Sequence, residues 1–174
     1  MKVPEIRPYS LPIDFSPTRA AQATNIATRN EALKLLSEGT TIVVFPGGGV
    51  STAPTTFGRA VDLPWKTFTA RMILSSKAQV LPLYFEGQCS PLFQWVSKWS
   101  ATLRLSLIIR EFRTRVGQPL RVHVGDVIPF ATCAQCTDRK ALINMLCERV
   151  HALGGIDPQE VHAELARLPR WLQE

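Results

Sequence analysis

An apolar run that stops abruptly at a proline and three glycines constrains this chain more than any other feature. Residues 40–51 read TTIVVFPGGGVS. The β-branched and aromatic residues 42–45 are typical of a buried strand, and Pro46 with the glycines after it ends that strand. Glycine has no Cβ atom, so the backbone N–H groups of such a loop can approach an anionic group closely. The pattern predicts a strand over residues 41–45 followed by a candidate binding loop.

Helix-like and strand-like patterns alternate along the rest of the chain. Helices are predicted over residues 20–37, 65–76, 138–153 and 158–168, and further strands over residues 79–85 and 120–127. Thr137 is the expected N-cap of the helix over residues 138–153. This alternation predicts the α/β class: a single layered domain over residues 1–174, with a mixed, mostly parallel sheet flanked by helices.

The charge and the cysteine content indicate which kinds of partner and which cellular compartment to expect. The formal net charge is +6, and residues 45–116 carry nine basic and three acidic side chains. A basic middle segment suits anionic partners such as phosphate groups or acidic lipid. Four cysteines in 174 residues do not indicate a disulfide scaffold, so a reducing, cytoplasmic setting is expected. The longest uncharged run holds several glycines and prolines, and it does not predict a membrane-spanning helix.

Five blocks follow one another between about residues 9 and 150. They are residues 45–51 (FPGGGVS), 65–67 (WKT), 80–87 (VLPLYFEG), 89–93 (CSPLF) with 109–112 (IREF), and 120–129 (LRVHVGDVIP). Their order resembles the lysophospholipid acyltransferase family of the glycerolphosphate acyltransferase type. The likeness is greatest to its hemolysin-like and ornithine-lipid acyltransferase branch. Residues 151–174 fall outside this resemblance and are expected to form a C-terminal helical extension.

The resemblance implies acyl transfer in membrane lipid synthesis. A fatty acyl group moves from an acyl-carrier-protein or coenzyme A thioester to the hydroxyl of a lysophospholipid or related lyso-lipid. It also implies a protein peripheral to the inner membrane, on an anionic lipid surface. No cofactor or metal is implied, and no nucleic acid partner is expected because a known nucleic-acid motif is lacking. The block that would hold the acceptor's head group comprises Phe45, Pro46, Gly47, Gly48, Gly49, Val50 and Ser51. The family's usual acidic residue after the proline is Gly47 here, and a lyso-ornithine head group fits comparably well.

The family's catalytic H-x-x-x-x-D motif has no counterpart in this sequence. The chain has three histidines, His123, His151 and His162, and none is followed by aspartate at that spacing. His123 and Asp126 lie three positions apart on a predicted strand, so their side chains are expected on opposite faces. The resemblance implies that the motif belongs to an upstream part absent from this chain, an N-terminal truncation. No catalytic residue is assigned, and a non-catalytic lipid-binding module that lost the motif is the alternative function.

Three other patterns favour different chemistry only weakly. Cys133, Cys136, Cys147 and His151 have a zinc-like outline. One continuous helix would separate Cys136 from Cys147 by about 16 Å, too far for one zinc ion. Residues 49–53 lack the second glycine of a nucleophile elbow. No Gly-Lys-Ser/Thr follows the glycines, which excludes a nucleotide P-loop.

The segment 89–116 combines apolar and basic side chains. Its five cations accompany one acid, Glu111, and two tryptophans, Trp95 and Trp99. Basic residues beside tryptophan suit an anionic lipid interface. The aliphatic residues equally suit a core that the tryptophans cap, and both interpretations stay open at this point.

Overall fold

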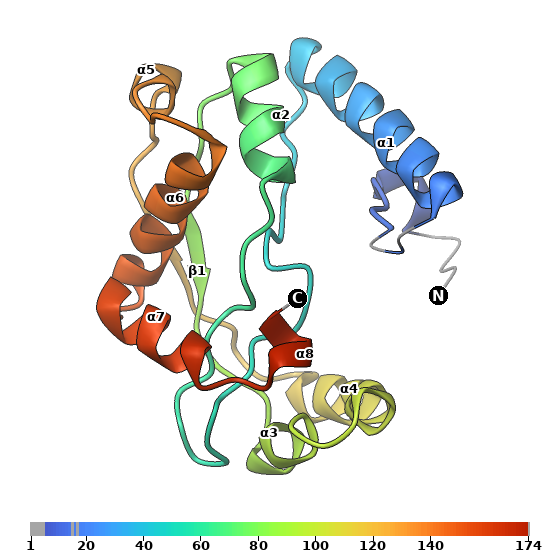
Figure 1. Cartoon of the computed structure of the whole chain (residues 1–174), viewed down its shortest axis with the longest axis vertical. Helices are drawn as coiled ribbons and strands as arrows, with labels where there is room; N and C mark the ends of the chain where they lie inside the picture. Colours follow the sequence, from blue (N-terminus) through green and yellow to red (C-terminus); the bar gives the residue numbers. More distant parts are fainter. Residues whose placement is uncertain (1–5, 15, 17, 174) are drawn as a thin grey trace.

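Helices dominate the chain, and they are arranged around one short strand pair. The computed structural model describes residues 6–14, 16 and 18–173. Its elements are η1 (Arg7–Tyr9), α1 (Arg19–Ser37), α2 (Phe68–Ser76), β1 (Leu83–Phe85), α3 (Pro91–Val96), α4 (Ala101–Arg115), β2 (Val122–Val124), α5 (Phe130–Ala134), α6 (Arg139–Leu153), α7 (Pro158–Ala166) and α8 (Arg170–Gln173). Figure 1 shows α2 between α1 and α6 at one end of the molecule, with α3 and α4 together at the other.

The four predicted helices are observed as α1, α2, α6 and α7, with small shifts at their ends. Thr18 begins α1, and its hydroxyl accepts a hydrogen bond from the Ala21 amide at 3.1 Å. The N-cap of α6 is Asp138 rather than Thr137, so that prediction was wrong. Asp138 has extended backbone angles, and its carboxylate accepts from the Ala141 amide at 2.8 Å. By accepting this hydrogen bond, the carboxylate satisfies an N–H group in the first turn of the helix that would otherwise be unpaired.

The sheet of the described residues consists of β1 and β2, which pair antiparallel with Tyr84 opposite His123. An isolated bridge between Val80 and Ile128 continues this pairing. Residues 41–45 form no hydrogen-bonded strand, so the strand predicted there is not observed. A strand needs backbone partners, and no neighbouring segment among the described residues supplies them to this run. The mixed, mostly parallel sheet stays a prediction.

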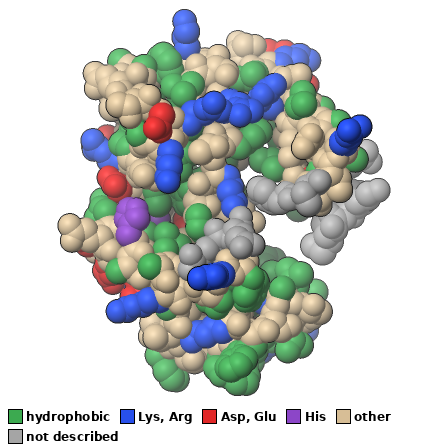
Figure 2. Space-filling view, viewed as in Figure 1, with side chains coloured by type: hydrophobic (Ala, Val, Ile, Leu, Met, Phe, Trp, Pro, Cys, Tyr) green, Lys and Arg blue, Asp and Glu red, His purple; other side chains and the backbone are tan. Residues whose placement is uncertain are grey.

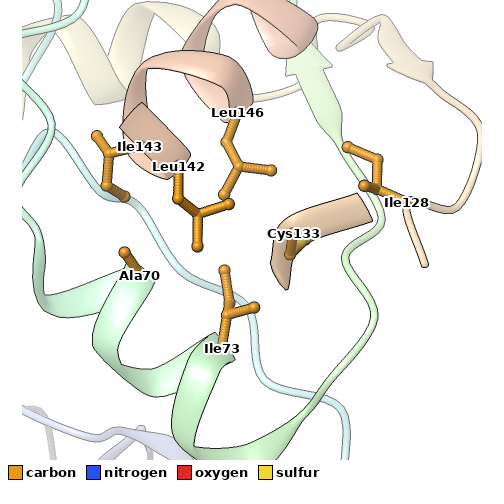
Figure 3. Packing of buried hydrophobic residues seen from close by; sticks show 7 residues of the cluster. All are labelled: Ala70, Ile73, Ile128, Cys133, Leu142, Ile143 and Leu146. Carbon is orange, nitrogen blue, oxygen red and sulfur yellow. The ribbon is translucent and has the colours of Figure 1, made fainter. Parts of the chain in front are cut away.

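The hydrophobic core lies between α2, α5 and α6. Figure 3 shows its seven buried residues: Ala70, Ile73, Ile128, Cys133, Leu142, Ile143 and Leu146. The side chains from α6 point toward those of α2, and Cys133 comes from α5. This cluster holds α2 and α5 against α6, which packs on β1, and it thereby positions one wall of the site described below.

The segment 89–116 forms the helix pair α3 and α4, and it divides between core and surface. Phe93 and Val96 are buried, whereas Trp95 and Trp99 are exposed, Trp99 by 75%. Arg104 is buried, so it is not one of the segment's surface cations. Figure 2 shows hydrophobic side chains gathered at the lower end of the molecule, where α3 and α4 lie. Among the described helices, none combines the length and the apolar character needed to cross a bilayer.

Candidate functional site

The glycine block lines a cavity of about 1110 Å³. All seven predicted binding residues, Phe45, Pro46, Gly47, Gly48, Gly49, Val50 and Ser51, contribute to its wall. The other walls come from α2, from β1 and the residues before it, from one side of α4, and from α6. The structure therefore brings the predicted loop to an open cavity and does not pack its glycines inside the protein. A cavity of this size accommodates a lipid-sized ligand.

The block's backbone depends on its glycines. Gly48 has a φ of 65°, in the left-handed region that residues with a Cβ atom adopt only at a cost. Its amide donates to the Phe45 carbonyl at 3.2 Å, closing a turn. A Cβ atom on Gly47 would lie 3.1 Å from the Leu63 carbonyl oxygen. A contact this tight would require the neighbouring backbone to shift. Within the described residues, the amides of Gly47, Gly49 and Ser51 have no hydrogen-bond acceptor. They remain donors for an oxygen of a ligand.

Two buried polar side chains hold the segment that follows the block. Arg104, on α4, donates to the Thr52 hydroxyl at 2.5 Å and also to the Val50 carbonyl. Gln94, on α3, accepts from the Ala53 amide at 2.8 Å. The guanidinium of Arg104 also lies 5.1 Å from the centroid of the Phe93 ring, a cation–π distance. Burial lowers the pKa of Arg104 from its ordinary value. The helix pair α3–α4 thereby fixes the far end of the block.

Ser51, Asp62 and Trp65 form a hydrogen-bonded group in the cavity wall. The Ser51 hydroxyl donates to Asp62 Oδ1 at 2.5 Å, and the Trp65 indole N–H donates to Asp62 Oδ2 at 3.2 Å. Because Ser51 donates to a carboxylate and not to an imidazole, its oxygen is not activated by a histidine, as a serine hydrolase requires. The arrangement instead holds Ser51 and Trp65 in fixed orientations beside the glycines.

The charged side chains of the cavity wall are mainly acidic. Asp62, Glu86 and Glu111 line it, with Arg115 as the one guanidinium among the lining residues that the structure describes. Glu111 accepts from the amide of Ser90 at 2.7 Å, so it also fixes the start of α3. Recognition of an anionic head group would therefore rest on backbone amides and Arg115. An amine-bearing head group would meet carboxylates.

The structure separates the three histidines. His123 Nε2 lies 2.6 Å from Oε1 of Glu86, the residue that follows β1, so its carboxylate partner is Glu86 and not Asp126. His162 is exposed, and its Nδ1 lies 2.7 Å from the Pro158 carbonyl. His151 is buried in the cavity wall, facing Trp65 with ring centroids 6.4 Å apart. Sequence reasoning missed His151 and Asp62 as site residues. A local pattern could not place them, because the fold brings them to the block from separate segments.

The zinc-like outline forms no metal site among the described residues. Cys133 is part of the core cluster, and Cys147 Sγ lies 3.4 Å from His151 Nδ1. Burial raises the pKa of Cys147 to about 12, so this thiol stays protonated and is a poor nucleophile or metal ligand. Over residues 6–14, 16 and 18–173, no three His, Cys, Asp or Glu side chains are grouped to hold a metal ion.

Comparison with known proteins defines the class of protein to which this site belongs. A family model described as acyltransferase matches residues 1–128. That span is well over half of the chain and includes the glycine block, so the chain belongs to this acyltransferase family and acyl transfer is its class of reaction. No curated protein and no solved structure matches the chain. The predicted acyltransferase family is confirmed, and the lysophospholipid and ornithine-lipid branch stays a prediction.

Proposed function

We propose that the protein transfers a fatty acyl group from an acyl-carrier-protein or coenzyme A thioester to the hydroxyl of a lysophospholipid or related lyso-lipid. The observation that carries this proposal is the cavity of about 1110 Å³ with the glycine block in its wall. Apolar side chains of Val44, Leu83 and Ile108 line the same cavity and suit an acyl chain. The unpaired amides of the block suit the oxygen of a thioester carbonyl or of a head group.

The balance of charges bears on the choice of acceptor. Three carboxylates and one arginine line the cavity among the described residues. This composition supports lyso-lipids that carry an amine, such as a lyso-ornithine lipid, at least as well as a glycerol phosphate. Assays should therefore offer both kinds of head group.

We further propose a cytoplasmic, membrane-peripheral location. An exposed apolar stripe, consisting of Leu105, Ile109 and Phe112 on α4 and of Val116 just after it, supports it. Leu105, Ile109 and Phe112 recur at helical spacing, so they share one face of the helix. The same stripe supports the second candidate function, a lipid-binding module without catalysis, because surface binding needs no general base.

Acyl transfer by the purified chain separates the two candidates. Palmitoyl-CoA would be offered with lysophosphatidic acid or lyso-ornithine lipid, and the diacyl product quantified by mass spectrometry. Val50→Trp, which adds bulk at the cavity wall, is expected to lower kcat/KM at least tenfold. Val124→Trp, at an exposed position outside the cavity, is the matched control and is expected to leave it unchanged. Absence of transfer to every lyso-lipid would reject the enzymatic proposal.

A further inference from the structure

The exposed apolar stripe and the cavity wall meet on one helix, α4. Leu105 and Ile109 belong to the stripe and do not line the cavity, whereas Ile108 and Glu111 line it. Successive residues of an α-helix are rotated by about 100° around its axis, so Phe112 is about 40° from Ile108 and about 60° from Ile109. Phe112 therefore lies between the cavity face and the stripe, and the two faces adjoin along the helix.

Phe112 takes part in both faces. It lines the cavity, and 70% of the residue is exposed. A residue that lines a cavity and is also largely exposed lies at the rim of that cavity. Phe45 and Phe85 combine the same two properties, and their ring centroids lie 6.4 Å apart. Aromatic side chains therefore mark where the cavity opens, and such a rim suits the passage of an acyl chain.

A guanidinium is held at the rim, three residues after Phe112. Arg115 lines the cavity and donates a hydrogen bond to the Gln88 carbonyl. The neighbouring Gly87 has a φ of 109°, and a Cβ atom on it would lie 2.7 Å from Arg115 Nη1. The absence of that Cβ atom lets the guanidinium rest against the backbone. A guanidinium fixed in this way suits a phosphate or a carboxylate, which accept its charge-assisted hydrogen bonds.

The exposed charged side chains of α4 are all basic. The structure describes this helix throughout, and its two buried charged residues are Arg104 and Glu111. The exposed ones are Arg110, Arg113 and Arg115. An apolar stripe accompanied by arginines is typical of a helix that lies in the interface of an anionic bilayer. This complementarity of charge favours an anionic membrane as the partner of this face, with the rim of the cavity at the membrane surface.

We propose that lyso-lipid enters the cavity directly from the bilayer across Phe112, and that Arg115 receives its phosphate or carboxylate at the rim. The proposal rests on the proposed acyl transfer to lyso-lipids and adds the route by which the acceptor reaches the site. Along this route the acyl chain passes from the bilayer to the aromatic rim and then to the apolar wall at Ile108. No step exposes the chain to water, which is the unfavourable alternative.

Two forms of one acceptor test the route, with palmitoyl-CoA as the donor. Oleoyl lysophosphatidic acid is presented in phosphatidylglycerol vesicles, and hexanoyl lysophosphatidic acid is dissolved as a monomer. Phe112→Ser replaces the apolar side chain at the rim by a hydroxyl. It should lower kcat/KM about tenfold or more for the acceptor in vesicles, and far less for the dissolved acceptor.

Ile109→Ser is the matched control for Phe112→Ser. Ile109 is 65% exposed on the same stripe but does not line the cavity. With vesicles in excess, so that each variant is membrane-bound, Ile109→Ser should keep the wild-type ratio of the two activities. An equal ratio for the two variants would overturn the route and leave the proposed function intact. Thermal melting checks that each variant is folded.

The role of Arg115 has its own comparison. Arg115→Gln should raise the KM for lysophosphatidic acid and for lyso-ornithine lipid in vesicles about tenfold, if the guanidinium receives either anionic group. An increase for one acceptor alone identifies the group that it receives. Arg113→Gln, at an exposed position outside the cavity, should leave both KM values near those of the wild type. Equal KM values for the two variants would overturn the part assigned to Arg115.

Photocrosslinking measures entry without depending on catalysis or on a variant. A lyso-lipid with a diazirine in its acyl chain, embedded in phosphatidylglycerol vesicles, should label Phe112 and the cavity residues Val44 and Leu83, as located by peptide mass spectrometry. Labelling confined to Leu105 and Ile109 would overturn the route, even if the wild type transfers acyl groups. Labelling inside the cavity without transfer to any lyso-lipid would reject the enzymatic function and support entry of lipid into a binding module.

Discussion

Gly48 sets the conformation of the block because its φ of 65° is natural only for glycine. Gly48→Ala should therefore reduce the free energy of unfolding by about 1–2 kcal/mol, the cost of a left-handed conformation for a residue with a Cβ atom. Acyl transfer should also fall, because relaxation of this strain moves the neighbouring amides. Urea unfolding and the transfer assay measure the two effects.

Gly117→Ala is the matched control for this prediction. Gly117 has a φ of 79°, lies outside the cavity and has open space around its Cβ position. We expect a similar loss of stability with normal transfer. Equal transfer by the two variants would show that the conformation of Gly48 does not matter for the site.

The sequence predicts those site residues that a motif of consecutive positions marks. The seven block residues carry their signal in consecutive positions, and all of them line the cavity. His151 lies on a helix that joins the cavity only after α6 packs on α2 and β1, and Asp62 comes from the loop between the block and α2. Neither has a neighbouring residue that marks it. A pattern of buried contacts formed by folding cannot be read from spacing along the chain.

Arg104 connects two elements that are far apart in sequence. Its guanidinium bridges α4 to Val50 and Thr52 through donors that a single ammonium group cannot reproduce. Arg104→Met should destabilise the protein by about 1.5–3 kcal/mol, the range for hydrogen bonds to charged groups. Arg104→Lys should not restore that loss. Urea unfolding measures both.

Arg113, on the same helix, is exposed and provides the comparison. Arg113→Met should change stability by less than about 0.5 kcal/mol, as is usual for surface substitutions. An equally small effect of Arg104→Met would mean that the contact of α4 with the block contributes little to the fold.

Helices were easier to predict here than strands, for a physical reason. The hydrogen bonds of α1 and α6 are internal, so apolar periodicity and a capping side chain suffice to locate them. A strand depends on a partner. Residues 79–85 and 120–127 pair over part of their predicted length, whereas residues 41–45 have the composition of a strand and no partner among the described residues. Their apolar side chains Val43 and Phe45 are exposed as a result.

Exposed basic and apolar side chains occur together on α4. Arg110 and Arg113 are exposed on this helix, which also bears the exposed apolar stripe. Anionic lipid attracts basic side chains, while apolar side chains enter the boundary of the acyl layer. Salt screens the electrostatic attraction and weakens it, whereas salt does not weaken the insertion of apolar side chains. These two contributions can therefore be separated by experiment.

Leu105→Glu combined with Ile109→Glu should weaken binding to phosphatidylglycerol vesicles about 100-fold or more. Each substitution removes a side chain worth about 1.5–3 kcal/mol on burial and adds a negative charge. Neither residue lines the cavity, so the fold and the site should persist. Ile26→Glu, at an exposed position on α1, is the control and should bind as the wild type does. Co-sedimentation at low and high salt measures the partition. If the α4 double variant binds as tightly as Ile26→Glu does, the stripe is not the membrane-contacting surface, and the protein must reach its lyso-lipid by another face.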